Sequence, residues 1–198
     1  MLKVGLYFGS FNPIHIGHIA IAGYILEFTT LEEVWFVVSP HNPLKKKETL
    51  LDNYQRLHMA NLAIGNNDRI RASDIEFKLP VPSYTIDTIA YLEEKYPEYR
   101  FSLVMGEDNL YTLHKWKNAG ELVKKCQIIV YPRPDAVKPS NPLLHQLLSE
   151  ADITVVKAPL MDISGTFIRN GIKKNKNMSY YLPAPVWKYI EEMHFYKK

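Results

Sequence analysis

A short turn segment near the start of the chain, FGSFNPIHIGH at residues 8–18, constrains the fold more than any other stretch. The apolar run before it, residues 2–7, has the composition of a β-strand, and the run after it, residues 19–26, has that of a helix. Gly9, Asn12 and Pro13 suit a tight turn, while His15 and His18 stand three positions apart at the helix start and therefore on one face. The unpaired amides and the macrodipole of a helix start favour an anion at this place.

The composition fits one globular domain over residues 1–198, with 46% hydrophobic residues and a formal net charge of +3. The single cysteine, Cys126, excludes an internal disulfide and fits a reducing compartment. No apolar run approaches the ~20 residues that cross a bilayer, so we expect a cytoplasmic protein without a membrane partner. The basic residues stand in short clusters, which favours small phosphorylated ligands over nucleic acid.

Strand-like and helix-like segments alternate along the whole chain, which predicts an α/β fold with a doubly wound, mainly parallel sheet. A small helical part is expected at the C-terminal end. In such a fold, ligands bind at the carboxyl ends of the strands near a switch point. The expected strands are residues 2–7, 34–38, 70–72, 101–105, 127–131 and 153–156. The expected helices are residues 16–28, 52–64 with Asp52 as cap, 85–96 with Ser83 or Thr85 as cap, 110–125 in two pieces around Trp116 and Gly120, 141–150, a segment starting at 164, and 183–196.

Polar residues follow three of the expected strands: Ser10 with His15 and His18, the loop from Pro40 to Lys47, and Gly106 with Asp108. Neither a GxGxxG nor a Walker A sequence is present, so binding would depend on helix amides and cationic side chains. A second stretch, ISGTFIR at residues 163–169, has Ser164 and Thr166 as candidate caps, with Arg169 about one turn further on. Alone, a cap and one arginine are an ordinary structural feature.

Together, HIGH at residues 15–18 and ISGTFIR resemble the two signatures of the HxGH nucleotidyltransferase superfamily. The resemblance implies that His15 and His18 contact a triphosphate and that the second stretch holds its β- and γ-phosphates. The chain departs from the usual pattern in three places. Phe8 stands where glycine is frequent, Asn12 where aspartate is usual, and Gly165 where serine is usual, so that Gly165 offers an amide but no hydroxyl.

Within the superfamily, essentially the whole chain is similar to bacterial nicotinate-nucleotide adenylyltransferases. Ser83-Tyr84-Thr85 resembles their SYT segment, Gly106 and Asp108 their GxD near the ribose, and Trp116 the tryptophan that stacks on the pyridine ring. Tyr131-Pro132-Arg133 resembles an arginine-bearing strand end. Lys45 lies in a loop that matches the family only loosely, so its role stays open. Core packing is the competing interpretation of Trp116.

The resemblance implies transfer of AMP from ATP to nicotinate mononucleotide, giving deamido-NAD and pyrophosphate in NAD biosynthesis, with Mg²⁺ carried on the ATP phosphates and no protein metal ligand. It implies His15, His18 and Arg169 as catalytic residues. The implied ATP site comprises Gly9, Ser10, Phe11, His15, His18, Gly106, Asp108, Ile163, Ser164, Thr166 and Arg169. The implied nicotinate-nucleotide site comprises Lys45, Tyr84, Thr85, Trp116 and Arg133.

Two other functions compete with this one: another adenylyltransferase of the superfamily, acting on pantetheine phosphate, and a nucleotide-sensing module that has lost turnover. A metal site on His15 and His18 lacks a third ligand at a recognisable spacing. The sequence leaves open the preference for nicotinate over nicotinamide, and also the oligomeric state, a homo-oligomer included.

Overall fold

The computed structural model describes residues 1–40, 50–134 and 136–197. Its centre is a six-stranded sheet in the order β3-β2-β1-β4-β5-β6, and every neighbouring pair is parallel. This order is that of a doubly wound Rossmann-like fold, whose switch point lies between β1 and β4. The strands are β1 (Leu2–Gly9), β2 (Glu33–Val38), β3 (Ile70–Ser73), β4 (Tyr99–Gly106), β5 (Ile128–Tyr131) and β6 (Ile153–Val155).

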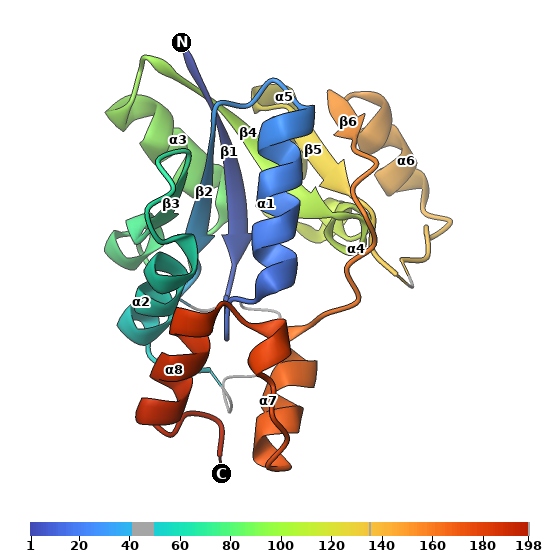
Figure 1. Cartoon of the computed structure of the whole chain (residues 1–198). Coiled ribbons are helices and arrows are strands. Elements are labelled where there is room, and N and C mark those ends of the chain that lie inside the picture. The colour runs from blue at the N-terminus through green and yellow to red at the C-terminus, as the bar shows by residue number, and fades with distance from the viewer. Residues whose placement is uncertain (41–49, 135, 198) are drawn as a thin grey trace.

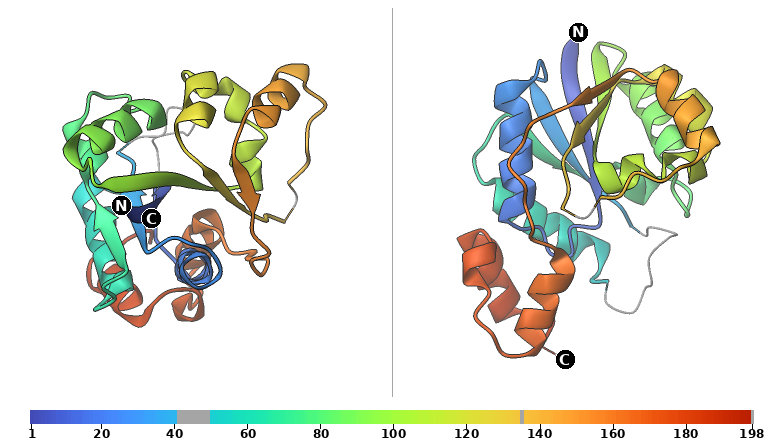
Figure 2. Two further views of the ribbon diagram at one scale, coloured as in Figure 1. Left: turned by 90° about the horizontal axis from the view of Figure 1, so that it is seen from above. Right: turned by 90° about the vertical axis from the view of Figure 1, so that its right-hand side faces the viewer.

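Helices cover both faces of the sheet (Figures 1 and 2). One face packs against α1 (Ile16–Phe28) and α2 (Asn53–Ile64), and the other against α3 (Thr85–Lys95), α5 (Ala119–Lys125) and α6 (Pro142–Ser149). Because both faces are covered, the central strands are continuous apolar runs such as VWFVV in β2. The predicted α/β class with a parallel sheet is therefore confirmed.

The C-terminal helices α7 (Gly165–Lys173) and α8 (Ala184–Glu192) lie beyond the carboxyl edge of the sheet, below it in Figure 1. Their buried side chains, such as Ile168 and Val186, belong to the same core cluster as α1 and α2. The helical part expected at this end is thus present, although α8 ends at Glu192 and not near residue 196.

Most predicted element boundaries agree with the structure, but the cap of α3 differs, as does the end of α8. Asp52 caps α2 as expected, because its carboxylate accepts from the Tyr54 amide at 2.9 Å. Tyr84, and neither Ser83 nor Thr85, is the residue before α3, and it makes no side-chain cap bond. The stretch 110–125, expected to be helical in two pieces, is divided in the structure as well. The first piece comprises α4 (Glu107–Leu110) and a 3₁₀ turn over Leu113–Lys115, and the second is α5, which Asn118 precedes with a left-handed backbone of φ 50°.

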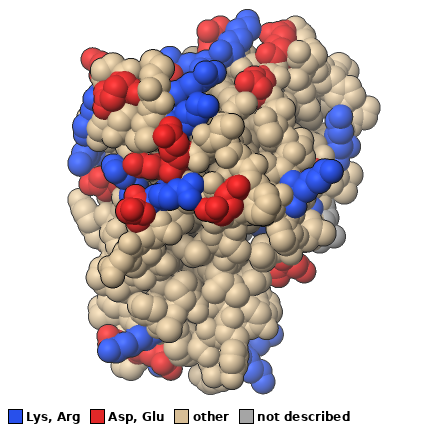
Figure 3. All heavy atoms as spheres, turned by 45° about the horizontal axis from the view of Figure 1, so that its top comes forward, with Lys and Arg blue, Asp and Glu red and all other residues tan. Residues whose placement is uncertain are grey.

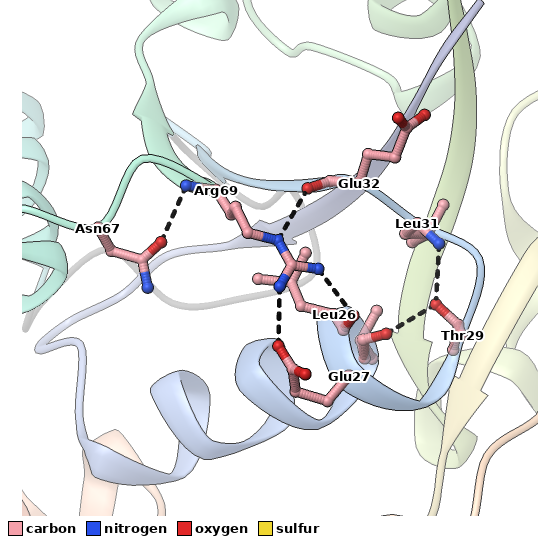
Figure 4. Close-up of polar contacts among 8 residues, drawn as sticks. Leu26, Glu27, Thr29, Leu31, Glu32, Asn67 and Arg69 are labelled. Carbon is pink, nitrogen blue, oxygen red and sulfur yellow. Dashed lines mark hydrogen bonds and ion pairs between the residues drawn. The ribbon is translucent and has the colours of Figure 1, made fainter.

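The far end of α1 is fixed by a small polar network (Figure 4). Arg69 donates to the Leu26 carbonyl at 2.8 Å and pairs with Glu27 at 2.8 Å. Thr29 Oγ1 donates to the Ile25 carbonyl at 2.7 Å, and the Leu31 amide donates to Thr29 Oγ1 at 3.2 Å. Two of the last four carbonyls of α1, those of Ile25 and Leu26, are satisfied in this way, so the helix is held at the end opposite to its two histidines.

The charges on the outer surface are mixed in sign over the upper part of the face drawn in Figure 3, and the lower part of that face is largely uncharged. Among the described residues, no helix is both long enough and apolar enough to cross a membrane.

Candidate active site

A cavity of about 440 Å³ opens at the carboxyl edge of the sheet, a volume within the range of ~300–1,000 Å³ usual for small-molecule sites. Its walls come from the turn after β1, the segment after β4, the end of β5 and the start of α7. It therefore lies at the switch point of the sheet, where the fold class places ligands. The predicted site residues that line it are Gly9, Ser10, Phe11, His15, His18, Asp108, Arg133, Ile163, Ser164, Thr166 and Arg169.

The turn after β1 reverses the chain sharply under this cavity. Phe11 has φ 44° in the left-handed region, and the Asn12–Pro13 bond is cis. A Cβ on Gly9 would lie only 2.9 Å from the Phe11 ring, so glycine is needed for this close approach. The Phe11 ring is buried and meets the His18 ring edge-on, with 5.0 Å between centroids. Phe11 thus lines the cavity mainly as a support beneath His18.

The two histidines stack at the start of α1, with 3.7 Å between their ring centroids. His15 is the N-cap residue, and its backbone N–H donates to Nδ1 of His18 at 3.2 Å. Because Nδ1 accepts, a neutral His18 carries its ring proton on Nε2. Gly17 leaves room for the pair, since a Cβ there would lie 3.1 Å from Nδ1 of His15. Each residue of the HIGH tetrapeptide apart from Ile16 is therefore fixed by local geometry.

His15 is only 4% exposed, and its charge state follows from that burial. Burial, with a smaller contribution from the positive charge of Arg133, lowers the pKa of His15 to about 4. In the ligand-free protein at neutral pH, the imidazole is therefore uncharged. It can act as a neutral hydrogen-bond donor or acceptor toward a ligand.

The buried His15 also makes a testable contribution to acid stability. Its folded pKa of about 4 lies below the ordinary value of 6.5, so the unfolded chain binds more protons between those values and acidification destabilises the fold. Between pH 7 and pH 5 we expect the ligand-free protein to lose about 2 kcal/mol of unfolding free energy through this group. Urea unfolding of the wild type and of His15→Gln at both pH values isolates the effect, because other groups titrate alike in both. An equal loss in the two proteins would contradict the assignment.

The start of α7 forms the opposite wall, and here the predicted Ser164 cap is confirmed. Ser164 Oγ accepts from the Phe167 amide at 3.1 Å. Arg169 donates through Nη1 to the Asn12 carbonyl at 2.7 Å and through Nη2 to Thr166 Oγ1 at 3.1 Å. A Cβ on Gly165 would lie 2.8 Å from the Asn12 carbonyl oxygen. Glycine therefore lets α7 approach the turn closely in this chain, which gives the departure from serine a packing reason.

Arg133, expected with the nicotinate nucleotide, lies in the same cavity as the histidines. Its Nε is 3.7 Å from Asp108 Oδ1, and its backbone amide donates to Glu107 Oε2 at 3.2 Å. Gly106 is not among the described cavity-lining residues, but a Cβ on it would lie 2.8 Å from Cγ of Arg133. The glycine thus allows the ends of β4 and β5 to bring Asp108 and Arg133 together.

The other residues expected with the nicotinate nucleotide, Tyr84, Thr85 and Trp116, are not among the described cavity-lining residues. Tyr84 and Trp116 are partly buried against the same apolar cluster. Lys117 connects their segments, because its Nζ lies 4.7 Å from the centre of the Tyr84 ring and 2.8 Å from Asp87 of α3. Lys45 lies outside the described residues.

Arg56 is a central residue of this region that sequence reasoning missed. It is fully buried on α2 and makes five hydrogen bonds, which go to the carbonyls of Ser10, Ser39, Pro40 and Leu51 and to Asn53 Oδ1. Burial lowers its pKa to about 10, so it stays charged at neutral pH. The signal was its spacing: Arg56 shares the buried face of α2 with Met59 and Ala60.

Glu76 is a second buried charged residue that the sequence did not single out. It is 2% exposed and accepts from Thr88 Oγ1 at 3.0 Å. Burial raises the pKa of its carboxyl group, while hydrogen bonds from Ser39, Thr88 and Ser83 act in the opposite direction. Glu76 therefore joins the end of β2 to the segment that carries Tyr84 and Thr85.

Among the described residues there is no group of three or more His, Cys, Asp or Glu side chains placed to hold a metal ion.

Comparison with known proteins assigns the chain to a family. Residues 6–171 match the cytidylyltransferase-like family, so the chain belongs to that family of nucleotidyltransferases. A probable nicotinate-nucleotide adenylyltransferase of Flavobacterium psychrophilum is 54% identical over 100% of both chains. One of Bacteroides thetaiotaomicron is 42% identical over 96% of this chain and 92% of its own. Within the larger family, the chain therefore belongs to the nicotinate-nucleotide adenylyltransferases and is an enzyme of that class.

Solved structures resemble the whole chain as well. Plasmodium falciparum nicotinic acid mononucleotide adenylyltransferase, in complex with NaAD, superposes with a TM-score of 0.79 at 19% identity, over 99% of this chain and 98% of its own. A putative nicotinate-nucleotide adenylyltransferase from Vibrio parahaemolyticus gives 0.71 at 18% identity, over 100% and 97%. At such low identity these likenesses establish the fold.

Proposed function

We infer that the protein transfers AMP from ATP to nicotinate mononucleotide, releasing pyrophosphate and forming deamido-NAD in the biosynthesis of NAD. One observation carries the inference: the stacked pair His15–His18 and the α7 start with Arg169 line one cavity at the switch point. The full-length relatives named nicotinate-nucleotide adenylyltransferases support the choice of acceptor. We also propose that residues 1–198 form a single domain, since α7 and α8 share a core cluster with α1 and α2.

The reaction needs no protein nucleophile. An ionised phosphate oxygen of the mononucleotide attacks the α-phosphorus of ATP, a P–O bond forms there, and the bond to the β-phosphate oxygen breaks as pyrophosphate leaves. The protein's task is to hold two polyanions in line and to stabilise the charge that develops on the departing group. Proximity and hydrogen-bond donors are therefore what the site has to supply.

We assign the ATP phosphates to the turn after β1 and the start of α7. The amides near Ser10 and the ring N–H of His18 would donate to the triphosphate, with His15 as a neutral partner beside it. Arg169 and the first amides of α7 would hold the leaving pyrophosphate. Gly106 and Asp108 would face the ribose. Mg²⁺ would enter with the triphosphate, held mostly by phosphate and water oxygens.

The acceptor would span two neighbouring places. The phosphate of the mononucleotide must reach the α-phosphate of ATP. A positively charged side chain that binds this phosphate should therefore lie in the same cavity as the histidines, and Arg133 does. The pyridine ring of the mononucleotide would then lie toward Trp116, with Tyr84 and Thr85 on the same side. The two-part placement explains why Arg133 is separated from the other acceptor residues.

A panel of acceptors tests the proposal. Pyrophosphate release is measured with ATP and Mg²⁺ plus, in separate reactions, nicotinate mononucleotide, nicotinamide mononucleotide and phosphopantetheine. We expect release with nicotinate mononucleotide, and the ratio to nicotinamide mononucleotide measures the specificity. Pyrophosphate release with phosphopantetheine alone would assign the chain to adenylyl transfer onto that acceptor. No release with any acceptor, from folded protein that binds ATP, would favour the sensing module.

Removing the Trp116 ring tests its place in the acceptor site. Stacking on an aromatic ring is worth about 1–3 kcal/mol per base, so Trp116→Ala should raise KM for nicotinate mononucleotide about tenfold. KM for ATP should change less than twofold and serves as the internal control. Equal changes in both constants would make Trp116 a core residue.

A further inference from the structure

Tyr196, which follows α8, reaches back to the turn that begins the active site. Its hydroxyl donates to Asn12 Oδ1 at 2.7 Å, a contact between residues 184 positions apart. Tyr196 itself has φ 64°, in the left-handed region that non-glycine residues adopt only rarely. The backbone after α8 is thus held in a conformation that directs this ring toward Asn12.

Asn12 is held on both of its oxygens by residues from the C-terminal part. Its side-chain Oδ1 accepts from Tyr196, while its backbone carbonyl accepts from Arg169 at 2.7 Å. Asn12 Oδ1 also lies 3.4 Å from the Leu51 amide that donates to it. Two residues earlier, the Ser10 carbonyl accepts from Arg56 at 2.6 Å. The backbone of the turn is therefore fixed by donors from α2 and α7, and the Asn12 side chain by the Tyr196 hydroxyl from the segment after α8.

The Tyr196 hydroxyl keeps its proton, although two positively charged arginines act on it. Burial raises the pKa of Tyr196, and the positive charges of Arg169 and Arg56 act in the opposite direction. The phenol is therefore protonated throughout the working pH range and remains a donor. The protonated Tyr196 hydroxyl can therefore hold Asn12 Oδ1 as an uncharged hydrogen-bond donor.

From these contacts we infer that Tyr196 is a positioning residue of the adenylyl-transfer site. Asn12 lines the cavity, whereas Tyr196 is not among its described lining residues. The tyrosine hydroxyl thus acts through Asn12: it holds the turn whose amides and histidines meet the triphosphate, without touching substrate. The inference rests on the proposed function for its kinetic readout, but ATP binding alone also tests it.

The experiment compares Tyr196→Phe, which removes only the hydroxyl, with Tyr180→Phe. Tyr180 belongs to the same C-terminal part and is 81% exposed, so it serves as the matched control. For Tyr196→Phe we expect ATP to bind about three- to tenfold more weakly, the loss of one hydrogen bond. The value of kcat/KM for ATP should fall by a similar factor, and KM for nicotinate mononucleotide should stay unchanged. Tyr180→Phe should match the wild type.

A double-mutant cycle separates positioning from general packing. In an Asn12→Ala background the partner of the hydroxyl is gone, so adding Tyr196→Phe should weaken ATP binding no further. A purely structural role of Tyr196 would give additive losses and equal effects on both substrates. Either of those results, or wild-type ATP affinity in Tyr196→Phe, would overturn the inference. If no acceptor supports turnover, the proposed function fails, while the ATP-binding arm still decides the role of Tyr196.

Discussion

Replacing His18 with alanine is expected to lower kcat about 100- to 1,000-fold, because one donor used mainly in the transition state is worth about 2.7–4 kcal/mol. The structure shows which ring nitrogen of His18 is the donor. The backbone amide of His15 donates a hydrogen bond to Nδ1 of His18 at 3.2 Å, so the ring proton of the neutral imidazole lies on Nε2. The ring is held between the stacked His15 and the edge of Phe11. Its orientation is thus fixed before substrate arrives.

His145→Ala is the matched control for this experiment, because His145 lies exposed on α6 and away from the cavity. It should keep the wild-type kcat. Steady-state pyrophosphate release measures both variants, and far-ultraviolet circular dichroism confirms that both are folded. A His18→Ala protein that retains near wild-type kcat would remove His18 from the mechanism.

Replacing Arg56 with methionine is expected to have the largest effect on stability. The substitution keeps an unbranched side chain but leaves four backbone carbonyls and Asn53 Oδ1 without their donor. Removing one partner of a buried charged network costs about 3–5 kcal/mol. Because the carbonyls belong to the turn after β1, the end of β2 and the start of α2, any remaining folded protein should also bind ATP poorly.

Arg69→Met is the control for Arg56→Met, because it removes an arginine network that is partly exposed. Arg69 also donates to two backbone carbonyls, those of Leu26 and Glu32, and pairs with the carboxylate of Glu27 (Figure 4). Its side chain, however, is 44% exposed. Exposed pairs of this kind contribute about 1 kcal/mol or less. Urea unfolding should therefore show a much larger loss for Arg56→Met. Equal losses would mean that Arg56 does not organise the site.

The parts of this protein that were predictable from sequence are those whose signal is local. The apolar runs predict the strands, and Asp52 and Ser164 are residue types that favour the N-cap position. The glycine and proline of residues 8–18 predict the turn. The boundary errors also have local causes. Tyr84 precedes α3 without a cap bond, and α8 ends at Glu192, short of residue 196, shortly before His194 adopts a left-handed backbone with φ 54°.

The supporting contacts of the site were not predictable, because each joins segments far apart along the chain. Nothing in the local sequence shows that Tyr196 meets Asn12, or that Arg56 donates to the Ser10 carbonyl. The close approach of Gly165 to the Asn12 carbonyl is a further example, since the sequence shows only the missing hydroxyl. Such contacts depend on how α2, α7 and the segment after α8 converge on one turn.

The most direct test of the central claim follows the phosphorus atoms of ATP. The protein is incubated with Mg²⁺, nicotinate mononucleotide and ATP labelled either at the α- or at the γ-phosphorus, and the products are separated. Adenylyl transfer predicts that the α-label appears in deamido-NAD and the γ-label in pyrophosphate, in equal amounts. A γ-label on the mononucleotide, or an α-label that ends only in ADP or free AMP, would contradict the assignment of the cavity to adenylyl transfer.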